Sequence, residues 1–386
     1  MPPLSDRTRL ISSATRRGKG RRPVNPPLER ASTMLSDSLG SMLDPTSGPI
    51  YGLDGLSAAS ALKAALADLE GADHAFLAPS GLAAVTIPLL ALLRPGDEVV
   101  ASDAIYGPSR RFITRYLGAR GVTSRFHPAD ASTETIVGML SSRTRVLLME
   151  SPASLTFEMA DAPALAHACR DRGVISILDN TWAAGLAFRA LEHGVDVSLQ
   201  ALTKYASGHS DVLMGSIVTR DPTIANALAD VIEDMGWHVS PDDAWLALRG
   251  LRTLPLRYAE QARSALTVAE WLQQRPEVTT VLYPPLPGSP SHAVWRRDFT
   301  GAASLMGVVL KEDAAFAERL LDALTLFGLG YSWGGFESLA TFESPQLAFR
   351  QHPPMLQGAL IRLHIGLEDP ADLIADIEQA LARAAD

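Results

Sequence analysis

One of the four lysines in this 386-residue chain stands where a lysine amine could do chemistry. Lys204 comes shortly after the apolar run 195–199 and precedes the polar, glycine-containing stretch 208–211. A lysine withdrawn from water has a lowered pKa and can form a Schiff base with a carbonyl group. The other lysines fit a polar tail, a solvated helix face and an exposed strand end, at Lys19, Lys63 and Lys311.

An aspartate that closes an apolar run is the second candidate. Asp179 directly follows the run 174–178. Burying a carboxylate there is costly unless it faces a cation or a metal. The ring nitrogen of pyridoxal phosphate, kept protonated by a carboxylate, is such a cation. A helix N-cap explains Asp179 equally well when the residue is taken alone.

Two further segments follow strand-like runs and carry polar or aromatic groups. Ser80 and Gly81 stand where a strand passes into a helix, and the free amides of a helix N-terminus bind anions. Ser80 is equally an ordinary helix cap. Tyr106 follows the next strand, where its ring could stack on a flat cofactor or simply pack against its neighbours.

These candidates need a framework that brings strand ends together. Apolar runs with strand character lie at 74–77, 98–101, 146–149, 174–178, 195–199 and 216–219. Helical stretches alternate with them at 56–69, 81–93, 108–118, 132–141 and 161–171. The alternation predicts an α/β fold with a mostly parallel sheet covered on both faces. Ligands of such sheets bind at the carboxyl ends of the strands.

The pattern changes after residue 221. Helical stretches are expected at 222–235 and 241–275, strands near 278–283, 303–310, 338–342 and 359–366, and a closing helix at 369–384. This order indicates a second, smaller α+β domain. A glycine fingerprint between a strand and a helix is missing from the sequence, which argues against a nicotinamide enzyme.

Composition narrows the class of protein further. The net charge of −9 argues against a general nucleic-acid binder. A single cysteine, Cys169, excludes an internal disulfide and a cysteine-rich metal site, and no metal site is expected. Residues 1–22 are basic and read as a disordered tail, without the apolar run of a secretory signal. The apolar stretch 82–93 is too short to span a bilayer, so we expect a cytoplasmic protein.

Three longer strings carry a resemblance to one family. The segments 200–205 (QALTKY), 331–338 (YSWGGFES) and 360–368 (LIRLHIGLE) resemble the pyridoxal-phosphate enzymes of cysteine and methionine metabolism, the cystathionine β-lyase, γ-lyase and γ-synthase family. The resemblance covers nearly the whole chain and is strongest to the β-lyases. It implies the fold-type I, aspartate-aminotransferase-like architecture of PLP-dependent transferases: a large domain with a mostly parallel seven-stranded sheet and a small α+β C-terminal domain.

The resemblance also implies how the chain is divided. An N-terminal arm at 23–55 would contact a neighbouring subunit, followed by a cofactor-binding domain at 56–250 and a C-terminal domain at 251–386. The assembly would be a homotetramer built from two dimers, in which Tyr51 reaches the neighbour's site. The family places an arginine after its Tyr-Gly pair, whereas Leu53 stands there in this chain. The contact with the cofactor phosphate across the dimer is therefore expected to be weaker or built differently.

Carried over residue by residue, the family motifs imply a complete site. Lys204, Tyr106 and Tyr51 would be the catalytic side chains, with Lys204 holding pyridoxal 5'-phosphate as a Schiff base and serving as general base and acid. The remaining cofactor contacts would be the ring-nitrogen partner Asp179 and the phosphate ligands Ser80, Gly81, Leu82 and Thr203. The amino-acid substrate would meet Arg362 through its α-carboxylate, in a pocket lined by Ser154, Ser332 and Trp333.

The implied reaction is β-elimination of L-cystathionine to homocysteine, pyruvate and ammonia, a carbon–sulfur lyase step of methionine biosynthesis. Three alternatives stay open at this point. The first is γ-chemistry of the same family, as γ-lyase, γ-synthase or sulfhydrylase. The second is a broad cysteine-S-conjugate β-lyase. The third is a non-catalytic protein that keeps the fold and uses its basic tail for binding.

Overall fold

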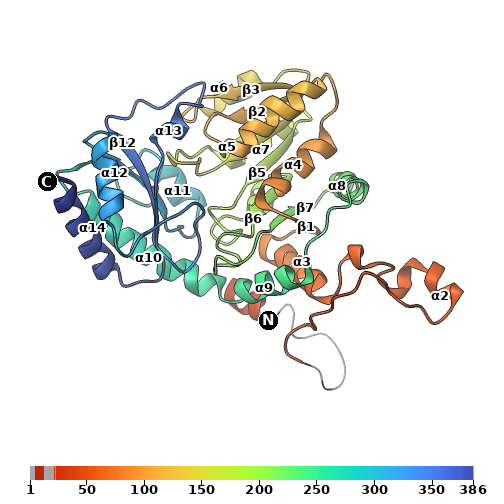
Figure 1. The fold of residues 1–386 in the computed structure, drawn as a ribbon. Helices are drawn as coiled ribbons and strands as arrows, with labels where there is room; N and C mark the ends of the chain where they lie inside the picture. The colour runs from red at the N-terminus through yellow and green to blue at the C-terminus, as the bar shows by residue number, and fades with distance from the viewer. Residues whose placement is uncertain (1–4, 13–20, 22, 386) are drawn as a thin grey trace.

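A seven-stranded sheet forms the centre of the larger part of the computed structural model, which describes residues 5–12, 21 and 23–385 (Figure 1). Its strands are β1 His74–Ala78, β2 Glu98–Ser102, β3 Thr123–His127, β4 Thr144–Glu150, β5 Ile175–Asp179, β6 Val197–Ala201 and β7 Gly215–Thr219. They lie in the order β1-β7-β6-β5-β4-β2-β3, parallel except that β7 runs antiparallel to β1 and β6. The predicted α/β class with a mostly parallel seven-stranded sheet is confirmed.

Helices cover both faces of this sheet. They are α3 Ser57–Glu70, α4 Gly81–Leu92, α5 Gly107–Arg111, α6 Thr133–Met139, α7 Ala162–Arg170 and α8 Pro222–Asp234. Alternate residues of β4 enter two separate cores, Val146 on the side of α4 and α8 and Leu147 on the side of α3 and α7. A strand buried on both faces is apolar along its whole length, which is why these strands stand out in the sequence.

Three local predictions differ from the structure. The strand β3 was not expected, because it lies at the sheet edge and carries polar, partly exposed residues. The single helix expected at 241–275 is two helices, α9 Pro241–Leu251 and α10 Leu254–Leu272. Pro255 explains the break, since proline fits the first turn of a helix but not its interior. The helix expected at 108–118 begins as α5 and continues as the π-helical turn η3, Phe112–Leu117.

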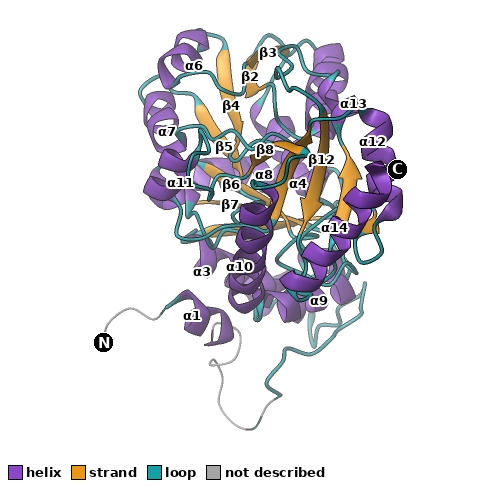
Figure 2. Ribbon diagram, turned by 90° about the vertical axis from the view of Figure 1, so that its left-hand side faces the viewer, coloured by secondary structure: helices purple, strands orange, loops and turns teal. Residues whose placement is uncertain are grey.

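A second sheet belongs to the C-terminal part of the chain. Its strands lie in the order β10-β11-β12-β9-β8, with bounds Gly328–Leu329, Leu339–Phe342, Ala359–His364, Leu305–Leu310 and Val278–Leu282. The helices that accompany them are α11 His292–Asp298, α12 Ala314–Ala323, α13 Ser344–Leu347 and α14 Pro370–Ala385. The helices α12 and α14 pack side by side against this sheet (Figure 2). The expected domain boundary at residue 250 falls in the last turn of α9, Pro241–Leu251, and stays a prediction.

The N-terminal part of the chain has two segments. The predicted disordered tail over 1–22 is wrong for residues 6–12, which form α1 Asp6–Ser12 (Figure 2). Leu10 is buried against α3, and Asp6 pairs with Arg189. Residues 1–4, 13–20 and 22 lie outside the described residues. The arm 23–55 is tied to the body where Asn25 contacts Arg252 and Arg30 contacts Asp242, and the part around α2 Leu39–Leu43 extends away from the body (Figure 1).

None of the helices in the described ranges is long and apolar enough to cross a membrane. The single cysteine, Cys169, is a buried free thiol on α7 that faces the core. Burial raises the pKa of this thiol to about 12, so Cys169 is a packing residue.

Candidate active site

Lys204 lies in the turn that follows β6, at the carboxyl edge of the large sheet. Its Nζ donates a hydrogen bond of 2.7 Å to Ser332 Oγ and lies 5.1 Å from the centre of the Trp333 ring. Ser332 adopts a φ of 87°, a left-handed conformation that is uncommon for serine and turns its side chain toward the amine. The structure thus brings Lys204 of the large domain together with Ser332 and Trp333, which follow β10.

The surroundings of the Lys204 amine lower its proton affinity. Burial and the positive charge of Arg362 lower the pKa of Lys204 to about 8, while Asp179 acts in the opposite direction. At pH 7 about a tenth of a group with this pKa is unprotonated, far more than for an ordinary lysine, and the unprotonated form is the one that attacks a carbonyl carbon or removes a proton. Lys204 is thus a lysine withdrawn from water at a strand end, as the sequence predicts.

Asp179 is the last residue of β5 and faces the same space. Its carboxylate accepts hydrogen bonds from the backbone N–H of Thr181, at 3.1 Å, and from the Thr181 hydroxyl. Residues 181–186 form turns, so the alternative interpretation of Asp179 as a helix N-cap is wrong. Burial raises the pKa of Asp179, and the two Thr181 donors and Lys204 oppose that shift. The geometry leaves Asp179 as a fixed acceptor for a cationic ligand.

The N-terminus of α4 lies beside the turn that carries Lys204. Ser80 caps this helix by accepting a 3.1 Å hydrogen bond from Ala83 N, so the cap interpretation of Ser80 is confirmed. The amides of Gly81 and Leu82, in the first turn, have no acceptor within the helix and are suited to an anion. The Thr203 hydroxyl is held by the backbone of Met214, with contacts of 3.0 and 3.2 Å.

Gly81 is required at this junction because α4 approaches β6 closely. A Cβ at Gly81 would lie 2.5 Å from Ala201 Cβ. We expect Gly81→Ala to displace the first turn of α4 and to weaken cofactor binding about tenfold or more, since overpacking costs about 1–3 kcal/mol. The matched control is Gly138→Ala, because a Cβ at that exposed helical glycine meets no atom within 4 Å. Spectrophotometric titration of each apoprotein with pyridoxal phosphate measures the cofactor affinity of the two variants. Equal affinities of Gly81→Ala and Gly138→Ala would contradict the expectation.

Arg362 projects from β12 in the small domain toward the same edge. Its side chain is only 13% exposed, and Nη1 lies 3.3 Å from Glu343 Oε1. Burial lowers the pKa of Arg362, and Glu343 partly opposes the effect. Thr341 Oγ1 donates to the same Glu343 oxygen at 2.7 Å. Glu343 therefore orients the guanidinium from one side and leaves its planar fork available to a carboxylate.

Ser154 joins the site through a residue that the sequence analysis missed. Ser154 Oγ lies 2.5 Å from Oε1 of Glu150, the last residue of β4, and the Tyr106 backbone N–H donates to Glu150 Oε2 at 2.7 Å. Arg350 fixes the same loop from the small domain by donating to the Ser154 carbonyl at 2.7 Å. Glu150 and Glu343 directly follow predicted strands, as Asp179 does. Their position at a strand end is therefore the signal by which the sequence could have indicated them.

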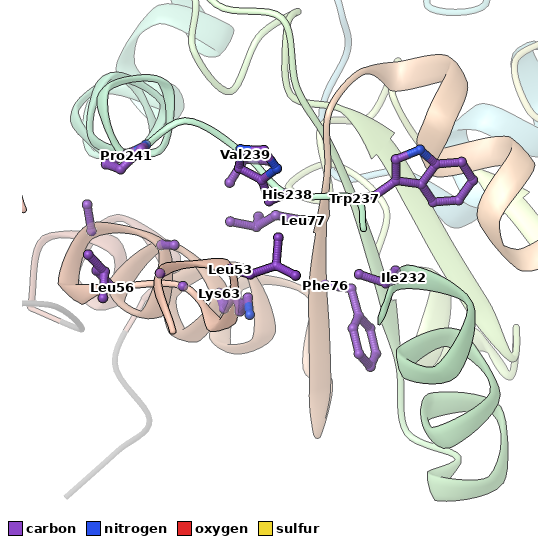
Figure 3. A pocket seen from close by; sticks show the side chains of 14 residues that line it. Leu53, Leu56, Lys63, Phe76, Leu77, Ile232, Trp237, His238, Val239 and Pro241 are labelled. Carbon is purple, nitrogen blue, oxygen red and sulfur yellow. The ribbon is translucent and has the colours of Figure 1, made fainter. Parts of the chain in front are cut away.

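Tyr51 and Leu53 are not brought to this site within the chain. Tyr51 lies in the arm, where it forms a β-bridge with Thr33. Leu53, at the position where the family has an arginine, lines an apolar pocket together with Phe76 and Leu77 (Figure 3). Lys63, expected on a solvated helix face, lies on α3, borders the same pocket and is half-buried.

Comparison with known proteins identifies this constellation. A family model described as "Cys/Met metabolism PLP-dependent enzyme" matches residues 7–382. The chain belongs to this family. It is 44% identical to a cystathionine β-lyase of Bordetella avium, over 95% of this chain and 94% of that protein. It is 41% identical to a cystathionine β-lyase of Escherichia coli, over 93% and 94% of the two chains. The solved structure of metB from Corynebacterium glutamicum superposes with a TM-score of 0.92, at 30% identity and 98% coverage of each chain.

The protein is thus an enzyme of the Cys/Met metabolism PLP-dependent family, and its cofactor is pyridoxal phosphate. The residues present fit that group. The first turn of α4 offers the amides of Gly81 and Leu82, Asp179 offers a buried carboxylate, and Lys204 offers an amine of lowered pKa. An anion site, an acceptor for a ring cation and a Schiff-base amine are the three features that this cofactor requires.

Proposed function

We propose that this enzyme is a carbon–sulfur lyase that converts L-cystathionine and one water to homocysteine, pyruvate and ammonia, in the cytoplasm and within methionine biosynthesis. The observation that carries the proposal is the position of the Lys204 amine, buried between Asp179 and Arg362 and bonded to Ser332. In this proposal Lys204 is the base, Asp179 the partner of the cofactor ring and Arg362 the partner of the substrate carboxylate. The β-lyases of Bordetella avium and Escherichia coli, at 44% and 41% identity, favour elimination at Cβ.

Lys204 has two tasks in this proposal. It binds the cofactor, and once the substrate amine has displaced it, its free Nζ removes the proton from Cα of the substrate. The cofactor, when bound, supplies an electron sink for the charge left on Cα. Nζ then carries a proton that it can return to the departing thiolate sulfur. The lowered pKa of Lys204, about 8, lets one amine accept and donate a proton near neutral pH.

The small domain orients the substrate. Arg362 binds the α-carboxylate through its planar fork, and the buried Glu343 keeps that fork in place. Ser332 and Trp333 line the pocket on the side of the Lys204 amine, and Ser154 lines it on the side of Tyr106. The Tyr106 ring would stack on the cofactor ring, and Thr203 would join the Gly81 and Leu82 amides in holding its phosphate.

The proposal extends to the assembly, a homotetramer of two dimers in which the arm 23–55 contacts a neighbour and Tyr51 reaches the neighbour's site. Its support is the exposure of large apolar side chains along the arm, at Leu35, Leu39, Met42, Leu43 and Ile50. Exposed apolar surface of this kind marks a protein–protein contact. Tyr51, which is 54% exposed, belongs to the same surface.

The oxo-acid product tests the reaction. Purified enzyme with pyridoxal phosphate and L-cystathionine is expected to release pyruvate and homocysteine in equal amounts, because elimination at Cβ leaves a three-carbon fragment. Release of 2-oxobutyrate would contradict the proposal and assign elimination at Cγ. A parallel assay with S-alkylated cysteines measures whether cystathionine is one substrate among several. An enzyme that binds the cofactor and releases neither oxo acid would support the non-catalytic alternative.

A further inference from the structure

Glu150 occupies a junction between the cofactor side and the substrate side of the site. Its Oε2 accepts from the backbone N–H of Tyr106, and its Oε1 lies 2.5 Å from Ser154 Oγ. It is the register partner of Asp179 on the neighbouring parallel strand, so two carboxyl groups end adjacent strands at the same edge. This pairing constrains the charge that the two groups can carry together.

The titratable and charged groups that face Glu150 come from three elements: Asp179 at the end of β5, Arg350 after α13 and Tyr106 after β2. Burial and the charge of Asp179 raise the pKa of Glu150 to about 8, although Arg350 and the two hydrogen bonds oppose the shift. Two buried carboxylates side by side share a proton. Asp179 retains the charge because both Thr181 donors and Lys204 favour its ionised form, which leaves the proton on Glu150.

The protonation state of Glu150 decides the direction of its contact with Ser154. An ionised Glu150 can only accept, so the Ser154 hydroxyl hydrogen would point at Glu150. A protonated Glu150 donates from Oε1 to Ser154 Oγ and still accepts the Tyr106 N–H at Oε2. The Ser154 hydrogen is then directed away from Glu150, toward the substrate pocket. Arg350, which holds the Ser154 carbonyl, keeps the serine in place in either case.

We propose that Glu150 is a positioning residue that acts in its protonated form, turning the Ser154 hydroxyl into a hydrogen-bond donor for the α-carboxylate of the amino-acid substrate. The inference rests on the proposed function, because it assumes that this carboxylate lies between Arg362 and Ser154. It adds a pH-dependent element to substrate recognition. When Glu150 ionises, it withdraws the Ser154 hydrogen and adds a negative charge near an anionic group.

Propionate, a carboxylate without an amine, tests the proposal as a competitive inhibitor of the holoenzyme. Its inhibition constant is expected to be flat below the pKa of Glu150 and to rise about tenfold by pH 9, because only the protonated form binds well. In Glu150→Gln the amide donates permanently to Ser154, so the constant is expected to stay flat over the same range. The matched control is Glu134→Gln, on the exposed face of α6, which is expected to keep the wild-type profile.

Infrared spectroscopy gives a second readout that does not depend on turnover. The wild-type holoenzyme at pH 7 is expected to show the carbonyl band of a protonated carboxyl group, which Glu150→Gln loses and Glu134→Gln keeps. Identical spectra, or identical pH profiles for wild type and Glu150→Gln, would overturn the proposal. Failure of the underlying function is distinguishable, because propionate affinity would then be unchanged in Arg362→Lys as well.

Discussion

Lys204→Ala is expected to lower kcat for pyruvate release by about 10³-fold or more, since a positioned general base alone contributes about 10²–10⁴-fold. The variant loses both the amine that binds the cofactor covalently and the base that removes the Cα proton. Ser332 loses its 2.7 Å partner and Asp179 loses a nearby cation, but both Thr181 donors still hold the Asp179 carboxylate, so the fold is expected to persist. Stopped assays with L-cystathionine, with pyruvate quantified, measure the change.

The control for this experiment is Lys311→Ala, because Lys311 is exposed after β9 and far along the chain from the site. It is expected to match the wild type. Borohydride treatment followed by mass measurement adds a structural readout: reduction should fix the cofactor to the wild type and to Lys311→Ala, but not to Lys204→Ala. A Lys204→Ala enzyme that works within tenfold of the wild-type rate would refute the role given to this residue.

Arg362→Lys is expected to lower kcat/KM about 30- to 150-fold, mostly through KM. The substitution keeps the positive charge but removes the planar fork, and a hydrogen bond to a charged group is worth about 2–3 kcal/mol. Glu343, which lies 3.3 Å from Nη1 and is fully buried, keeps a cation beside it, so the fold is preserved. Arg362→Lys therefore tests recognition of the substrate carboxylate without a loss of stability. Arg362→Ala would confound the two, because it leaves the buried Glu343 without its cation.

Arg296→Lys is the matched control for this second prediction, since Arg296 is exposed on α11. Steady-state kinetics of the three proteins on L-cystathionine give kcat and KM separately. A loss confined to kcat would show that Arg362 acts in the chemical step rather than in binding. An unchanged KM would contradict the placement of the substrate carboxylate.

The fold could be predicted from the sequence wherever burial is two-sided. The runs 146–149 and 174–178, which contribute to β4 and β5, are apolar apart from Ser176 because both faces of the sheet are covered, and such runs are visible without a structure. The strand β3 escaped notice because it is an edge strand with polar residues, Ser124 and Arg125 among them. The break between α9 and α10 depends on Pro255, which lies in the first turn of α10. A proline fits the first turn of a helix but not its interior, so the sequence alone leaves open whether a new helix begins there.

The site was predictable in its strand-end residues and not in its cross-domain contacts. Lys204 and Asp179 follow apolar strands directly, so their placement at one edge follows from the topology of a parallel sheet. The contact of Arg350 with the Ser154 carbonyl joins residues 196 positions apart through a loop without periodicity. Pattern and spacing carry no information about such a contact, which depends on how the two domains pack.

The hydrogen bond between Lys204 and Ser332 also has a consequence for the time at which the enzyme becomes reactive. The two residues are 128 positions apart, and a ribosome adds about 5–20 residues per second, so roughly 6–26 seconds of synthesis separate them. During this interval the amine exists on a nascent chain that lacks both Ser332 and Arg362. Because these later residues help to bury the amine and lower its pKa, the growing chain carries an ordinary, charged lysine. The amine is therefore expected to gain its lowered pKa only after the small domain has been made.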